Sequence, residues 1–430
     1  MDRPPPTSLI GRGQRVEGLR ARPEYDGRVA ELIDLLGPGE DLAWELMLPT
    51  DQVYRSREPE PGSEPSTLRI FMNNWKLLSG KVNQFTLARA YLQGDIDLEV
   101  DGDLSDVFIL RDQMDGGTTI TQAARLLGEL ALVAPTRVNA GVIKRHYDVG
   151  EDFHLCFLDE RYHLYSTLIF AGEVTRSLED AARAKCERMH HALGLKQGDH
   201  ILDIGGGWGG LARYCRELDI DVKVTSLTIS EDSEQFIKRL IAEEDLNADV
   251  IREDFLEYRA WQEYDHVVIF GVIEHIPNYA RFCERVWDAL KPGGMIYMDA
   301  SATKEKYAAS AFTRRYTWTG AHSCLVLPDM LQELIRHGFH VEQVLNETDD
   351  YRLTMRKWAE KLDRPETVER IRRTWGDHLY RGYRLYLWGG THAFSSDRLQ
   401  AYSIVARRGD KPGPRPGTLR RVASFVASLR

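Results

Sequence analysis

The sequence predicts an α/β protein whose main domain is a doubly wound, Rossmann-like sheet. Short apolar segments typical of strands alternate with helical segments through the second half of the chain, as expected of parallel strands joined by helices. One strand ends in a glycine-rich turn that opens a helix, as in nucleotide-binding folds. The last two strands could pair as an antiparallel hairpin. The expected strands are 200–204, 222–227, 248–252, 265–271, 294–299, 339–345 and 400–407.

The glycine-rich turn predicts a ligand site. Asp203 ends the strand, and five of the next seven residues are glycine. Glycine lets a ligand approach the backbone, and the N–H groups at the following helix start favour a negatively charged group. A dinucleotide site expects an acidic residue at the end of the next strand, but that strand ends in Thr228, Ile229 and Ser230. The turn alone leaves a dinucleotide and S-adenosylmethionine (SAM) as alternatives.

Composition narrows the class of protein. The 430 residues allow two or three domains. No apolar run approaches the roughly 20 residues needed to span a bilayer, and the N-terminus lacks the apolar segment of a signal peptide. The net charge of −10 disfavours nucleic-acid binding. The five cysteines form no Cys-x-x-Cys pair, which indicates reduced thiols in the cytoplasm and no metal site.

Changes in composition divide the chain into five segments. Residues 1–20 are rich in proline and arginine and are predicted to be a disordered tail. Residues 21–118 mix strand and helix patterns and predict an α+β domain. A helical linker over 119–139 leads to the main domain, 140–409. Residues 410–430 form a basic, amphipathic tail.

The stretch from Leu87 to Leu104 resembles small lipid-binding domains of the sterol-carrier type. It also resembles the domain that precedes the methyltransferase core in bacterial cyclopropane-fatty-acid synthases. The resemblance implies a lipid-binding role for residues 21–118. The alternative is an ordinary α+β oligomerisation domain, which would fit a homodimer.

Six motifs of the main domain together resemble the family of cyclopropane-fatty-acyl-phospholipid synthases and mycolic-acid methyltransferases. Glycine turns and Lys-Pro-Gly-Gly occur in many methyltransferases, whereas the His-Tyr-Asp, Tyr-Ser and Glu-His elements together are specific. The resemblance covers roughly residues 140–407 and implies a class I SAM-dependent methyltransferase fold with SAM as cofactor. The motifs are His146–Gly150, Leu158-Asp159 with Tyr165-Ser166, Leu202–Gly210, Leu227–Ser230, Glu274–Ile276 and Leu290–Gly294.

The same resemblance implies where the cofactor binds. The glycine turn passes close to the methionine part, the Tyr-Ser pair contacts the amino-acid end, and the tip of the second strand meets the ribose and adenine. The family often has Gln where this chain has Ser233, which puts that contact in doubt. Alternatively, Asp203 only caps the turn, Phe255 is plain core and Tyr165 is structural. The implied cofactor-binding residues are Tyr165, Ser166, Asp203, Gly205, Gly207, Thr228, Ile229, Asp254 and Phe255.

Catalysis by this family requires a base. An isolated cis double bond is a weak nucleophile, and its attack on a sulfonium methyl leaves a carbocation. The site must exclude water and stabilise that cation. In cyclopropane synthases the resemblance implies a bicarbonate base, held by a Cys, a Glu, a His and a Tyr. This sequence keeps Glu274 and Tyr351 but has Thr167 at the Cys position and Asp299 at the His position.

These two replacements make bicarbonate doubtful, because a carboxylate at position 299 should repel an anion. Asp299 or Glu274 is then expected to act directly as base or cation stabiliser. The alternatives are a Glu274 bonded to backbone, an Asp299 paired with Arg or Lys, and a His146 in a structural hydrogen bond. The predicted catalytic residues are Glu274, Tyr351, Asp299, His146 and Thr167.

The departure favours a methylene product over a cyclopropane ring. A hydride shift followed by proton loss from the new methyl leaves a methylene branch, as in actinobacterial enzymes that begin 10-methyl (tuberculostearic-type) fatty acid synthesis. The expected substrate is an oleoyl-like phospholipid chain, and a separate reductase would saturate the product. The alternatives are a true cyclopropane synthase and a SAM-binding lipid sensor without catalysis.

Two segments could help the enzyme reach a membrane lipid. The aromatic stretch from Arg314 to Trp318 could line the acyl pocket or touch the bilayer. In residues 419–430, Val422, Phe425, Val426 and Leu429 form one apolar helical face with arginines at its ends. Such a helix is attracted to anionic lipid, which predicts a peripheral protein at the inner face of the membrane. The alternative is a tail that is disordered or docks on a partner subunit.

Overall fold

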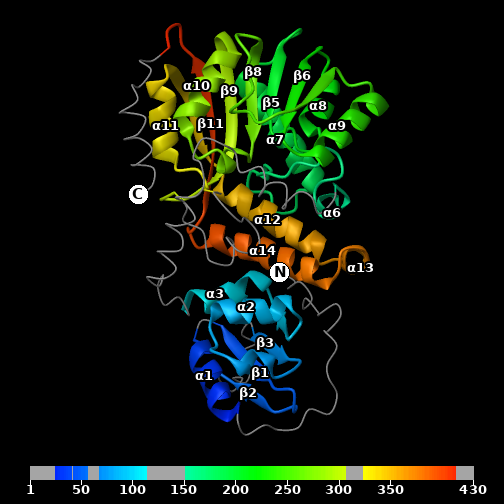
Figure 1. The fold of residues 1–430 in the computed structure, drawn as a ribbon, viewed down its shortest axis with the longest axis vertical. Helices are drawn as coiled ribbons and strands as arrows, with labels where there is room; N and C mark the ends of the chain where they lie inside the picture. Colours follow the sequence, from blue (N-terminus) through cyan, green and yellow to red (C-terminus); the bar gives the residue numbers. More distant parts are fainter. Residues whose placement is uncertain (1–24, 41, 57–66, 114–150, 307–322, 413–430) are drawn as a thin grey trace. The chain divides into compact units, whose positions relative to one another are not determined.

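A computed structural model describes residues 25–40, 42–56, 67–113, 151–306 and 323–412 (Figure 1). The chain forms two compact units, each described by itself. The first contains Met1–Ala124 and Leu362–His392, and the second contains Arg125–Lys361 and Ala393–Arg430. The second unit carries the glycine-rich turn.

A seven-stranded sheet forms the centre of the second unit, and all seven predicted strands are confirmed. Their order across the sheet is β10-β11-β9-β8-β5-β6-β7, and Figure 1 shows β5 between β8 and β6. The strands are β5 (His200–Ile204), β6 (Lys223–Thr228), β7 (Ala248–Arg252), β8 (Tyr264–Phe270), β9 (Leu290–Ala302), β10 (Phe339–Asn346) and β11 (Gln400–Arg408).

The pairing of the strands confirms the doubly wound fold. β5 pairs in parallel with both β6 and β8, and β8 pairs in parallel with β9. β11 runs antiparallel to β9 and to β10, so the last two strands pair as predicted, although residues 347–399 lie between them and they do not form a tight hairpin. The chain order reverses at β5, between β6 and β8. In open α/β sheets ligands bind at this switch point, outside the carboxyl ends of the strands.

Helices between the strands complete the core of the second unit. α7 (Leu178–Leu193) begins at Ser177, whose side chain caps the helix, and ends at Gly194 in the left-handed conformation. The apolar core gathers side chains from β5, β8, β9 and α10. The other helices are α6 (Glu151–Leu155), α8 (Gly210–Arg216), α9 (Glu231–Glu244), α10 (Tyr279–Ala289), α11 (Leu327–Arg336) and α12 (Thr348–Leu362).

The first unit holds a four-stranded sheet of order β2-β1-β3-β4 with helices beside it. Most of its elements were expected from the sequence, but β2 was not, because three residues carry too short a pattern. An Asn83–Thr86 capping box begins α2. The elements are α1 (Asp26–Leu36), β1 (Ala43–Met47), β2 (Val53–Arg55), β3 (Thr67–Met72), α2 (Gln84–Leu92), β4 (Ile96–Val100) and α3 (Val107–Gln113).

Two helices from the end of the chain belong to this first unit. They are α13 (Pro365–Thr374) and most of α14 (Asp377–Ser395). The Arg381 guanidinium donates to Asp97 on β4 at 2.7 Å and to the carbonyl of Tyr91 at 3.1 Å. Arg384 pairs with Asp363 at 3.0 Å, and both are buried. The compact units therefore differ from the predicted domains, which placed 362–392 within 140–409.

Several predictions concern residues outside the described ranges: the tail 1–20, the linker 119–139, His146 with its motif, the stretch 314–318 and the helix at 419–430. Among the helices that the structure does describe, none combines the length and apolar character needed to cross a bilayer.

Candidate active site

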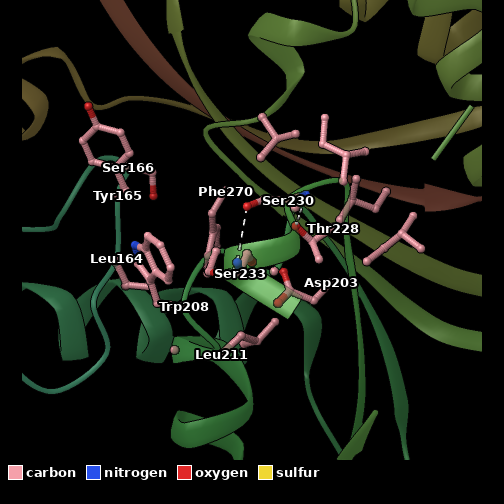
Figure 2. A pocket seen from close by; sticks show the side chains of 18 of the residues that line it. Leu164, Tyr165, Ser166, Asp203, Trp208, Leu211, Thr228, Ser230, Ser233 and Phe270 are labelled. Carbon is pink, nitrogen blue, oxygen red and sulfur yellow. Dashed lines mark hydrogen bonds between the residues drawn. The ribbon is translucent and has the colours of Figure 1, made fainter. Parts of the chain in front are cut away.

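A cavity opens at the carboxyl ends of β5 and β6, at the switch point of the sheet. Its empty volume is about 1030 Å³, including the part open to solvent. The walls come from residues 162–166, the glycine turn, the tip of β6 and the segment after β8. Figure 2 shows Tyr165 and Trp208 on one side of this cavity and Asp203 and Thr228 on the other.

The glycine turn is shaped by close packing. Gly205 has a φ of +87°, and a Cβ there would lie 2.3 Å from Cγ2 of Val272. A Cβ on Gly210 would lie 2.0 Å from the carbonyl oxygen of Tyr162. Only glycine fits either position. The turn therefore holds the 162–166 segment against the start of α8, and both line the cavity.

Replacing Gly210 by alanine is expected to weaken binding of S-adenosylhomocysteine (SAH) by at least about tenfold. The added methyl group must push the Tyr162 backbone away, and this displaces the cavity wall. Isothermal titration measures the affinity. The control is Gly27→Ala in α1, where a Cβ meets nothing within 4 Å. Unchanged SAH affinity in Gly210→Ala would contradict this view of the wall.

Asp203 lies on the cavity wall at the end of β5. Its carboxylate accepts a hydrogen bond from the Ser226 hydroxyl at 3.1 Å. Burial raises the pKa of Asp203 to about 7. A positively charged ligand in the cavity would favour the ionised form. Asp203 is therefore a buried carboxyl group on the cavity wall.

The tip of β6 supplies short polar side chains. Thr228, Ile229 and Ser230 all line the cavity. Ser233 also lines it, and its hydroxyl donates to the carbonyl of Gly207 at 2.5 Å. The serine at the position where the family often has Gln therefore braces the glycine turn. No carboxylate lies at the tip of β6, although Glu253, beyond β7, reaches the wall.

Tyr165 belongs to an aromatic cluster beside the cavity. Its ring lies 5.2 Å from that of His154 and 5.3 Å from that of Trp358. Trp208, within the glycine turn, lies 6.2 Å from His154. Burial lowers the pKa of His154 to about 3, so its ring is neutral at neutral pH. Aromatic faces of this kind favour a cation where water is absent.

A buried lysine joins three predicted site residues. Lys185 on α7 is completely buried, and its ammonium donates to the Ser166 hydroxyl at 2.5 Å and to the Thr167 carbonyl at 2.8 Å. It also forms an ion pair with the Asp299 carboxylate. Burial raises the pKa of Asp299 to about 6, and Lys185 opposes this rise. Asp299 is therefore paired with Lys185, the alternative that the sequence left open.

Glu274 lies in a short turn after β8 and is buried. Its Oε1 accepts from the backbone N–H and the hydroxyl of Ser301, both at 2.9 Å. Within the described parts of the chain, Oε2 has no hydrogen-bond partner. Burial raises the pKa of Glu274 to about 7, and the charge of Asp299 adds to the rise. Its neighbour His275 lines the cavity, and burial lowers the pKa of that imidazole to about 4.

The remaining predicted residues lie at different places. Phe255 lines the cavity and also belongs to the apolar core. Asp254 is not on the cavity wall, and its carboxylate accepts from the N–H of Leu256 at 2.9 Å. Tyr351 lies on α12 away from the wall, where it stacks on Phe394 at 4.7 Å. Thr167 is fully buried, and its Oγ1 has no hydrogen-bond partner within the described ranges.

Several residues of this site were missed from the sequence. Trp208 and Phe270 line the cavity, as does Glu253. Lys185 lies behind it, with its ammonium 4.2 Å from the centre of the Phe270 ring. Trp208 stands within the glycine motif, which was the available signal. A lone lysine in an amphipathic helix gives no such signal, because that pattern is typical of a solvent-exposed position.

Comparison with known proteins shows the family to which this chain belongs. The family model described as mycolic acid cyclopropane synthetase matches residues 135–404. The chain belongs to this family. The matched range contains the cavity, Lys185, Glu274 and Asp299.

Individual relatives have low sequence identity to this chain, but the alignments cover most of its length. The probable fatty acid methyltransferase of Pseudomonas putida is 27% identical over 332 residues, which cover 74% of this chain and 81% of that protein. The cyclopropane-fatty-acyl-phospholipid synthase of Escherichia coli (strain K12) is 27% identical over 277 residues, covering 63% of this chain and 69% of that protein. The solved cyclopropane synthase MmaA2 from Mycobacterium tuberculosis shares the fold, with a TM-score of 0.58 and 23% identity over 63% of this chain and 99% of that one.

Family membership defines the class of reaction. The chain is a SAM-dependent enzyme of the methyltransferase class, and its family methylates or cyclopropanates unsaturated fatty acyl chains. The cavity fits the cofactor. Gly205 and Gly210 bring backbone close to the ligand space, and buried polar groups such as Asp203 and Ser166 lie on its wall.

Proposed function

We propose that this enzyme methylates the cis double bond of an oleoyl-like phospholipid chain and leaves a methylene branch, the precursor of a 10-methyl fatty acid. The observation that carries the proposal is the buried pair of Lys185 and Asp299 beside Glu274. The pair supports direct catalysis by a side chain, without a bound anion.

Bicarbonate does not fit this group of residues. An ammonium has three donors, and Lys185 directs them to Ser166, Thr167 and Asp299. No donor of Lys185 remains for an added anion. Asp299 acts only as an acceptor when ionised, and its charge would repel bicarbonate. The mechanism therefore contains no step through bicarbonate.

Glu274 is the better base of the two carboxylates. Asp299 is held by Lys185, whereas Oε2 of Glu274 has no partner within the described ranges. A general base works best when its pKa is near the working pH, and the pKa of Glu274 is raised to about 7. The buried charge also stabilises a developing carbocation.

The order of two events decides the product. The cofactor supplies the methyl group to one alkene carbon, which leaves a cation on the other. Immediate loss of a proton from the new methyl would close a cyclopropane ring. If a hydride first moves from the methylated carbon to the cationic carbon, the cation becomes tertiary, and loss of a methyl proton to Glu274 then gives a methylene branch, C=CH₂, on the acyl chain. We infer that a base fixed by Ser301, with no mobile anion beside it, leaves time for the shift.

The turnover rate is expected to rise with pH through about 7. Glu274 must be ionised to accept a proton, and its raised pKa of about 7 means that the protonated, inactive form predominates below this pH. Measuring kcat at saturating SAM removes the effect of Asp203 on cofactor binding. A kcat that is constant from pH 5.5 to 8.5 would remove Glu274 from this role.

Other parts of the proposal concern location and partners. An acyl chain in a phospholipid requires a protein that works at the cytoplasmic face of the membrane, and residues 419–430 are our candidate for the contact. Saturating the methylene branch would require a separate reductase. Cyclopropane synthesis is the second candidate, supported by the retained Glu274 and Tyr351.

Expression in a host that contains oleoyl phospholipid tests the function. Fatty acids are analysed by mass spectrometry before and after catalytic hydrogenation. A product with one added carbon that takes up two hydrogen atoms supports the methylene proposal. A product with one added carbon that resists mild hydrogenation indicates a ring and overturns the proposal. If no product with an added carbon appears, although the purified protein binds SAM, the result would favour the lipid sensor.

A further inference from the structure

Lys185 is a buried cation whose contacts converge on one loop. Its side chain is 1% exposed, and that of its partner Asp299 is also 1% exposed. Removing an ammonium ion from water is costly unless it is paired and hydrogen-bonded. Here the cost is offset by Asp299 together with Ser166 and Thr167, the two residues that follow Tyr165.

The bond between Lys185 and Ser166 fixes the direction of the serine proton. An ammonium can only donate, so the Ser166 oxygen must be the acceptor in this 2.5 Å contact. The hydroxyl proton of Ser166 is then free to be donated elsewhere. Ser166 lies on the cavity wall, and Figure 2 shows it beside Tyr165 there. The polarised hydroxyl is a strong donor for an anionic group in the cavity.

We propose that Lys185 is a positioning residue for the cofactor, acting through Ser166 on the carboxylate of its amino-acid part. The carboxylate is the anionic group of SAM that a polarised hydroxyl would bind. The ion pair with Asp299 holds Lys185 in place, and the bond to the Thr167 carbonyl holds the backbone of the loop. This inference rests on the cofactor and is independent of whether the product is a methylene branch or a ring.

Two ligands separate this role from a merely structural one. SAH carries the amino-acid carboxylate, whereas 5′-methylthioadenosine lacks the whole amino-acid part. The variant Lys185→Met is expected to bind SAH at least about tenfold more weakly and to bind 5′-methylthioadenosine within about twofold of the original protein. Isothermal titration measures both affinities. Equal losses for the two ligands, or no loss for SAH, would overturn the proposal.

A matched control is Lys361→Met. Lys361 is also a buried lysine of the second unit, and its ammonium donates to the carbonyl of Leu158 at 2.7 Å. Within the described ranges it forms no hydrogen bond or ion pair with Ser166 or Asp299, so its replacement should leave the ratio of the two affinities unchanged. A changed ratio in Lys361→Met would mean that the ratio does not report on Lys185.

The double variant Lys185→Met/Asp299→Asn keeps the test valid if the single variant unfolds. It removes both charges of the pair, so neither is left buried alone. It is expected to fold and still to bind SAH at least about tenfold more weakly, with 5′-methylthioadenosine unaffected. A folded double variant with the original SAH affinity would contradict the role of Lys185.

Discussion

Replacing Glu274 by glutamine is expected to lower kcat by about two to four orders of magnitude, the usual contribution of a general base. Glutamine has nearly the same shape, so its oxygen can still accept from the N–H and hydroxyl of Ser301. It can neither take a proton nor stabilise a cation by charge. The affinity for SAH should stay within a few fold, since Glu274 is not on the cavity wall.

Steady-state turnover and SAH titration on the same preparation check this expectation. The control is Glu333→Gln on α11, another buried glutamate, which pairs with Arg336. That variant should keep its turnover. Normal turnover in Glu274→Gln would remove Glu274 from the mechanism, and a parallel loss in Glu333→Gln would show a general effect on folding.

The variant Asp299→Ala is expected to lose about 3–5 kcal/mol of unfolding free energy. The change leaves the Lys185 ammonium buried without its counter-charge, because Ser166 and Thr167 offer only neutral acceptors. Adding Lys185→Met should recover most of the loss. Urea denaturation measures the unfolding free energy of the single and double variants.

An exposed ion pair provides the control for this second prediction. Asp249 pairs with Lys223 at 2.8 Å, and both side chains are largely exposed. Its replacement by alanine should cost at most about 1 kcal/mol. A similarly small cost for Asp299→Ala would mean that the buried pair does not hold the loop. Asp299→His would also leave Lys185 buried without its counter-charge. An attempt to change the product by substituting residues 299 and 167 must therefore replace Lys185 as well.

The sheet could be predicted because its strands carry their own signal. Most of the strands contain a short apolar run bounded by turns, and the antiparallel pairing of the last two followed from the family pattern. The cofactor site followed from the glycine motif and the Tyr-Ser pair, since both are local in sequence. The two motifs are far apart in the chain, but the fold brings them together, because Gly210 packs directly on Tyr162, in the segment that carries the Tyr-Ser pair.

The parts that could not be predicted depend on contacts between distant residues. Nothing in the helix around Lys185 indicates that it reaches Asp299, which is 114 positions later in the chain. Nothing in the sequence of α14 indicates that Arg381 reaches Asp97 on β4. Asp254 was placed at the adenine by resemblance, whereas the adjacent Glu253 is the one on the wall.

Carbon-13 NMR of the lipid product made with SAM labelled at its methyl carbon tests the central claim most directly. The purified enzyme acts on vesicles of oleoyl phospholipid, and the labelled carbon appears either as an alkene CH₂ or as a cyclopropane ring CH₂. The direct action of Glu274, without bicarbonate, predicts the alkene signal and the same yield in buffer freed of carbon dioxide. A ring signal that needs added bicarbonate would contradict it.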